Sequence, residues 1–146
     1  MSQAYLTLKQ EAYELWLDEE LLTRLNGGAA ALLAGAGPQL REIDIETAIE
    51  HAEDWLMPFS KQLEGLQLTV RDSTGRLRSR FSEHAPYSVE QVEQAFTNVH
   101  YEVVRGQTHD SDGVADIVLL RELAHHGRLS GVVLDVADAR PDNRAE

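Results

Sequence analysis

Cysteine is absent from this chain. Its absence excludes thiolate nucleophiles, disulfide bonds and every zinc site that is built on cysteine. Long apolar runs are absent too, because the stretches 28–37 and 114–120 are far shorter than the roughly 20 residues that span a bilayer. Residues 1–8 hold no basic segment that leads into an apolar run, so no secretory signal is expected. We therefore predict a cytoplasmic protein.

Positive charge is scarce, with 13 lysines and arginines against 25 aspartates and glutamates and a net charge of −12. A chain this acidic repels phosphate backbones, so nucleic acid is not an expected partner. The first 60 residues hold 11 acids and three bases, which gives this half a net charge of −8. Such an acidic half suits solubility alone, or contact with a basic protein partner.

The length of 146 residues is typical of one domain, and a domain of this size buries enough surface to fold without a metal or a disulfide. We predict a single globular domain over residues 1–138, followed by a flexible tail over residues 139–146. The stretch 28–38 is rich in glycine and alanine, and it suits either a short helix or a loop.

Two helices are predicted in the N-terminal half from the spacing of the apolar residues. The first covers residues 3–26 and ends at Asn26, which two glycines follow. Its leucines recur at helical spacing: Leu8, Leu15, Leu22 and Leu25. The second covers residues 45–63, with Asp44 as its N-cap and Pro58 as the point where it kinks or ends.

Beyond residue 65 the apolar period falls to two, which predicts strands. Residues 66–71 and 77–81 alternate apolar and polar side chains about a turn at 72–75, where glycine favours a tight connection. This pattern predicts a β-hairpin with one apolar face and one polar face. Four arginines share the polar face: Arg71, Arg76, Arg78 and Arg80.

Helices and strands are predicted to alternate over the rest of the chain. Ser88 and Gln91 form a capping box that begins a helix. Residues 100–105 read as a strand, residues 114–126 as a buried helix, and residues 129–136 as a final strand. The predicted class is α+β: two N-terminal helices, a β-hairpin, then alternating helix-strand-helix-strand, forming a small four-stranded mixed sheet packed by helices.

The hairpin arginines are the first candidate site. Arginine forks suit phosphate or carboxylate groups, so we predict that this face binds a partner or an anion. The alternative is that the same arginines pair inside the chain with acids of the second helix: Glu46, Glu50 and Glu53.

The second candidate site lies in the C-terminal third, where histidines and acids gather. Glu122 and His125 have the spacing that places both on one face of a helix, where they can bind the same metal ion. The predicted metal ligands are His100, His109, Asp110, Glu122 and His125. The alternative places His125 and His126 in the last helical turn, where a protonated histidine is favoured at the negative end of the helix dipole. It leaves His109 and Asp110 in a solvated turn.

No catalytic motif names a reaction, because the chain has neither a Gly-x-Ser-x-Gly elbow nor a cysteine. We therefore predict a small acidic, non-enzymatic binding or regulatory module that acts through protein–protein contacts and forms oligomers. The alternative is a metal-binding domain or a metal-dependent hydrolase that uses the C-terminal cluster. Residues 68–77 resemble the opening of a ligand-sensing domain, which keeps a small-molecule sensor as a third possibility. The sequence implies no particular cofactor.

Overall fold

The computed structural model describes residues 2–81, 86–107 and 110–135. Five strands form one sheet in the order β3-β2-β1-β4-β5. The strands are β1 (Ala4–Leu8), β2 (Ala12–Leu17), β3 (Glu20–Asn26), β4 (Gln67–Asp72) and β5 (Gly131–Leu134). The first three form an antiparallel meander, whereas β4 runs parallel to β1 and β5 runs parallel to β4. The sheet is therefore mixed.

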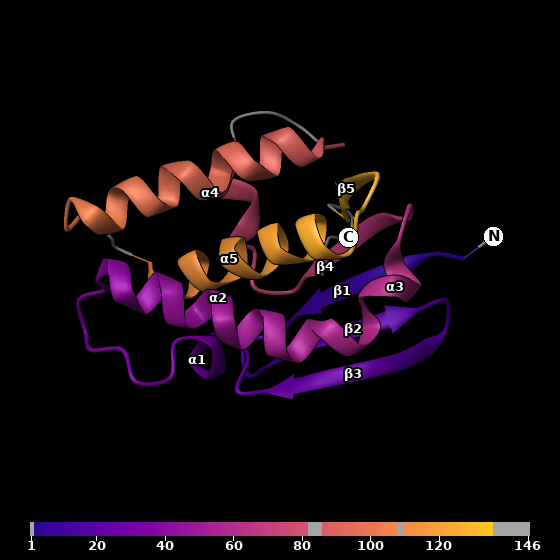
Figure 1. Ribbon diagram of the computed structural model, residues 1–146, viewed down its shortest axis with the longest axis horizontal. Coiled ribbons are helices and arrows are strands. Elements are labelled where there is room, and N and C mark those ends of the chain that lie inside the picture. Colours follow the sequence, from indigo (N-terminus) through magenta and orange to yellow (C-terminus); the bar gives the residue numbers. More distant parts are fainter. Residues whose placement is uncertain (1, 82–85, 108–109, 136–146) are drawn as a thin grey trace, which may run out of the picture.

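Helices form two layers above this sheet (Figure 1). They are α1 (Ala29–Leu32), α2 (Glu42–Leu56), α3 (Ser60–Leu63), α4 (Val89–Val104) and α5 (Ser111–His126), with short 3-10 turns η1 (Met57–Phe59) and η2 (Leu77–Arg80). Helix α5 lies in the middle, packed against α2 on one side and α4 on the other. Among the described residues, no helix has the length and apolar character that crossing a membrane requires.

Helix α5 is the centre of the core. Every residue from Gly113 to Leu120 is buried, as expected for a helix that is apolar on nearly all sides. The sheet contributes the alternating side chains of β1, β2 and β4 that face the helices: Leu6, Leu8, Tyr13, Leu15, Leu68 and Val70. The opposite side chains of the same strands, such as Tyr5 and Thr7, are only partly buried. One face of the sheet therefore belongs to the core.

The predicted α+β class and the helix-packed mixed sheet are confirmed, but the N-terminal helix over residues 3–26 is wrong. These residues form three strands, which raises the strand count from four to five. The seven-residue spacing of Leu8 and Leu15 resembles a helical repeat, but the two leucines lie on neighbouring antiparallel strands joined by a loop. Both side chains are buried on the face of the sheet that the helices cover. Asp18 then adopts a φ of 54°, which lets the chain turn sharply between β2 and β3.

The predicted hairpin is half right. Strand β4 forms as expected, but its second arm is the 3-10 turn η2, and β4 pairs in parallel with β1 and β5 instead. The Asp72 carboxylate accepts hydrogen bonds from the backbone N–H groups of Thr74 and Leu77, at 2.9 and 2.8 Å. These bonds curl the chain into a local turn and divert it from a returning strand.

The strand over residues 100–105 is wrong, since α4 continues to Val104. The capping box that begins α4 is confirmed: the Gln91 N–H donates to Ser88 Oγ at 3.1 Å, and the Ser88 N–H donates to Gln91 Oε1 at 2.8 Å. The buried helix and the last strand are confirmed as α5 and β5. The second helix forms as α2, but Arg41 is its N-cap, Asp44 lies at its third position, and it ends at Leu56, before Pro58. The predicted tail lies outside the described residues.

Candidate functional site

The carboxyl ends of β1 and β4 meet at one edge of the sheet. The chain leaves β1 towards β2 on one side and leaves β4 towards β5 on the other, so the strand order changes direction between them. Ser73 ties the two ends together, because its N–H and its hydroxyl both donate to the Leu8 carbonyl, at 3.0 and 2.8 Å. Ligand sites in sheets with parallel strands favour this position.

A hollow of about 340 Å³ opens at this edge. Its lining, which we call the edge pocket, is Thr7, Lys9, Glu14, Trp16, Arg71 and Ser73. Thr7 pairs in register with Glu14 of β2 and with Arg71 of β4, so these three side chains form a row across the sheet. The row lies on the face that the helices leave uncovered, because the buried neighbours Leu6 and Leu8 point the other way.

Glu14 is the buried anion of the edge pocket, with 6% of its surface exposed. Its carboxylate lies 3.2 Å from Lys9 Nζ and 2.5 Å from Arg24 Nη1, and it accepts a hydrogen bond from Trp16 Nε1 at 3.3 Å. Burial alone would raise its pKa, but the bonds from Lys9 and Trp16 and the two positive charges outweigh burial and lower the pKa. Glu14 therefore stays ionised and anchors Lys9 beside the pocket.

Arg71 is the second cation of the edge pocket. Its guanidinium stacks over the Tyr5 ring at 4.0 Å from the ring centroid, which fixes its plane. It forms no ion pair with any residue that the structure describes. A guanidinium that is held in place without a carboxylate partner is suited to an incoming oxyanion.

A buried network braces the same edge from the helix side. The Asp116 carboxylate, fully buried on α5, accepts a bond from Tyr13 Oη at 2.6 Å and bonds from Arg76 Nε and Nη2 at 3.0 and 3.2 Å. Burial, and then the charge of Asp116, raise the pKa of Tyr13 far above its ordinary value, so the phenol remains a donor. Burial also raises the pKa of Asp116, against the bonds from Arg76 and Tyr13. The network fixes the loop after β4.

The four arginines predicted to share one face are dispersed, because η2 replaces the second strand. Arg76 pairs with Asp116, and the Arg80 guanidinium lies 3.2 Å from a Glu102 carboxylate oxygen of α4. Arg78 donates to the Phe81 carbonyl at 3.1 Å. The described partners of these three come from α4, α5 and nearby loops, and Arg71 alone lines the edge pocket. Anion binding by the whole set stays a prediction.

The predicted metal ligands are also spread apart. His100 lies 3.3 Å from Glu42, and Asp110 accepts the Gly113 N–H at 3.0 Å as the N-cap of α5. His109 lies outside the described residues. His125 is exposed on α5 and does not join Glu122. Metal binding by that set stays a prediction.

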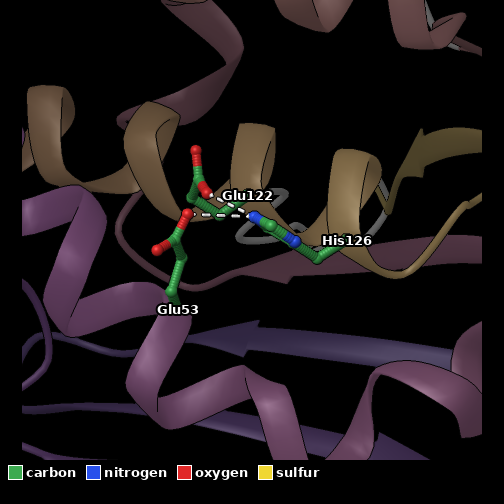
Figure 2. Close-up of side chains that lie close together, drawn as sticks. All are labelled: Glu53, Glu122 and His126. Carbon is green, nitrogen blue, oxygen red and sulfur yellow. Dashed lines mark hydrogen bonds and ion pairs between the residues drawn. The ribbon is translucent and has the colours of Figure 1, made fainter.

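Glu122 instead meets a different histidine. It is 1% exposed, and its Oε1 lies 3.1 Å from His126 Nε2, while Glu53 of α2 approaches the same nitrogen at 3.0 Å (Figure 2). Burial raises the pKa of Glu122, against the opposing bond from Arg121. Glu122 therefore meets His126, four positions later on the helix, and does not meet His125, three positions later.

Sequence reasoning missed Thr7, Lys9, Glu14 and Ser73. The first three were assigned to a helix and Ser73 to a hairpin turn, so none could be placed at a strand end. A signal was present in the alternation of Ala4, Leu6 and Leu8 with polar or aromatic neighbours, which is the strand period.

No protein-family model matches the sequence, and no curated protein matches it significantly. Solved structures do match the fold. A Ppx/GppA family member from Aquifex aeolicus gives a TM-score of 0.68 at 12% identity, over 99% of this chain and 58% of that chain. The type II variant of the Aquifex aeolicus Ppx/GppA phosphatase gives 0.68 at 10% identity, over 97% of this chain and 57% of that chain. The chain therefore spans less than three fifths of the length of these neighbours.

These neighbours correct the functional prediction. A non-enzymatic regulatory module acting through protein–protein contacts is wrong, because the solved structures that share this fold are described as phosphatases and enzymes. The alternative prediction of a hydrolase agrees better with them.

Proposed function

We propose that this chain is a phosphohydrolase domain that binds the phosphate group of its substrate in the edge pocket. The observation that carries the proposal is the placement of Lys9 and Arg71 in one hollow at the carboxyl ends of β1 and β4. The likeness in fold to Ppx/GppA phosphatases supports a phosphorylated substrate. This chain covers less than three fifths of the length of these neighbours, so hydrolysis is part of the proposal and does not follow from the likeness in fold.

The edge pocket has the groups that phosphate recognition needs. Arg71 offers a planar fork of donors that matches phosphate oxygens. Lys9 uses one of its donors on Glu14 and, as an ammonium, has three in total, so others can reach a ligand. Thr7, whose side chain also lines the pocket, lies between Glu14 and Arg71 in the row. Two cations in a chain of net charge −12 form a local attraction for an anion.

The chemistry required of these residues is mainly electrostatic. Phosphoryl transfer is catalysed largely by positioning the phosphate and by stabilising the charge on its oxygens. Arg71 and Lys9 can do both. Glu14 is a weak general base because its pKa is lowered, so its role is to hold Lys9 in place.

Binding of pyrophosphate, measured by calorimetry, tests the recognition step. Arg71→Gln should weaken binding at least about tenfold, the equivalent of about 1.4 kcal/mol, because it removes the unpaired cation. The matched control is Arg128→Gln, which removes an arginine that is 77% exposed and lies outside the pocket. Equal effects of the two variants, or no saturable binding by the wild type, would contradict the proposal.

Release of inorganic phosphate from pyrophosphate and tripolyphosphate tests the reaction itself. The wild type should release phosphate, and Lys9→Gln and Arg71→Gln should both slow the release. Pyrophosphate binding without any release would remove the hydrolase and leave only a phosphate-binding domain. The predicted cytoplasmic location, the protein partner and self-association stay predictions.

A further inference from the structure

Glu53, Glu122 and His126 form a second polar cluster, between α2 and α5 and separate from the edge pocket (Figure 2). We call it the interhelix cluster. One potential ligand atom from each residue lies within 4.8 Å of the other two. Glu122 is almost fully buried, whereas the side chains of Glu53 and His126 are 38% and 30% exposed, so solvent reaches the cluster from one side.

Two carboxylates approach the same ring nitrogen of His126. His126 Nε2 lies 3.0 Å from a Glu53 oxygen and 3.1 Å from a Glu122 oxygen. One ring nitrogen carries at most one hydrogen, which can point well at only one of the two acceptors. Two carboxylate oxygens and one imidazole nitrogen that converge on a common space also offer the ligand types that zinc binds.

Negative charge around the interhelix cluster exceeds positive charge. Arg121 bonds Glu122 Oε2 at 2.8 Å and Glu93 Oε1 of α4 at 3.2 Å, so two carboxylates share one guanidinium. With Glu53 added, three carboxylates stand against the one guanidinium, and the formal charge of these four groups is −2. A divalent cation at the interhelix cluster would neutralise it.

We propose that Glu53, Glu122 and His126 bind a divalent metal ion of the zinc class, which cross-links α2 to α5. The N and O ligands of zinc lie at about 2.0–2.2 Å from the metal, which places tetrahedral ligand atoms about 3.3 Å apart. The distances of 3.0 and 3.1 Å from His126 Nε2 to the two carboxylate oxygens are within a few tenths of an ångström of this spacing. One nitrogen ligand favours Zn²⁺ over the harder Mg²⁺, which prefers oxygen and water.

The surroundings support the ligands in the usual way. Metal-binding carboxylates are generally held by a further hydrogen bond, and Arg121 holds Glu122 by Oε2 while Oε1 faces His126. Three protein ligands leave a fourth position for water, on the side where Glu53 and His126 are exposed. The proposal is independent of the phosphohydrolase function and of the edge pocket.

Calorimetric titration of the chelator-treated full chain with ZnCl₂ tests the site. Wild-type protein should bind one equivalent, and a hundredfold excess over Kd should raise the melting temperature by about 5–10 °C. MgCl₂ at the same concentration should neither bind there nor displace Zn²⁺. Glu53→Gln and His126→Gln should each weaken Zn²⁺ binding at least tenfold. Both side chains are partly exposed, so these variants keep the fold.

The matched control is His125→Gln, which removes the exposed histidine whose ring lies 5.2 Å from that of His126. It should bind Zn²⁺ like the wild type and show the same rise in melting temperature. No saturable binding by the wild type would overturn the proposal. Loss of binding in His125→Gln or His100→Gln, with binding retained in Glu53→Gln, would overturn it equally, because it would place the ion at another histidine.

Discussion

Replacing Asp116 with alanine tests the buried network that braces the edge of the sheet. Asp116 is fully buried and accepts three hydrogen bonds, one from Tyr13 and two from Arg76. Its removal leaves the Tyr13 hydroxyl without this acceptor and leaves Arg76, whose side chain is 15% exposed, without its closest carboxylate. The loss therefore combines an orphaned donor with an uncompensated charge.

The size of the effect follows from this geometry. Removing one partner of a buried ion pair costs about 3–5 kcal/mol, out of a total stability of about 5–15 kcal/mol for a domain. For a chain of this length, that corresponds to a fall in melting temperature of about 10–16 °C. Tyr13→Phe should cost about 1.5–3 kcal/mol, since it removes one hydrogen bond to a carboxylate. The double variant should cost less than the sum, because the two side chains share a contact.

Urea unfolding and thermal melts of the variants provide the measurement. Asp112→Asn is the matched control, since Asp112 lies 3.8 Å from the same Arg76 but is 43% exposed. Its loss should cost less than about 1 kcal/mol, as for exposed ion pairs. If Asp116→Ala is no more damaging than Asp112→Asn, the network does not stabilise the edge and the reasoning fails.

Three further predictions concern stability. Ser88→Ala removes the cap of α4 and should lower the urea-unfolding free energy by about 1 kcal/mol; no change would mean the cap contributes nothing. Gly28→Ala should lower the free energy of unfolding by about 2–4 kcal/mol, because φ at Gly28 is +55° and a Cβ there would lie 3.0 Å from the Ala12 nitrogen. Gly35→Ala, with open space around it, should lower it by about 1 kcal/mol. Equal losses in the two variants would refute the clash. Because the pKa of Glu14 is lowered, its ionised form stabilises the fold at neutral pH. This contribution is lost as the pH falls below the ordinary glutamate pKa of 4.5 towards the pKa in the folded state. Glu14→Gln should flatten that part of the pH–stability profile, and an unchanged profile would contradict this prediction.

The fold could be predicted from the sequence wherever a local signal was unambiguous. The capping box at Ser88 and the apolar helix α5 gave true boundaries, because both depend on neighbouring residues alone. The N-terminal meander could not be distinguished from a helix by the spacing of its leucines. A seven-residue spacing puts two leucines on one face of a helix, and it also puts them on one face of two strands that a turn connects. The parallel pairing of β4 with β1 joins residues more than 60 positions apart, and no local pattern encodes it.

The candidate site followed the same division. Arg71 was named from its residue type, but its role depends on Thr7 and Glu14 lying in register beside it. Glu122 was named from its spacing to His125, yet the partners that reach it are His126 and Glu53 of another helix. Sequence spacing identified chemically apt residues, and the tertiary contacts decided which of them meet.

The parallel strands at the centre of the sheet have a consequence for biosynthesis. Strand β1 is made before its neighbour β4, which begins at Gln67, and before β5, which begins at Gly131. One side of β1 therefore stays unpaired until β4 is made, and one side of β4 stays unpaired until β5 leaves the ribosome. Long-range pairings of this kind fold slowly and expose unpaired strands meanwhile. A nascent chain truncated before residue 131 should thus engage chaperones more than one that includes β5.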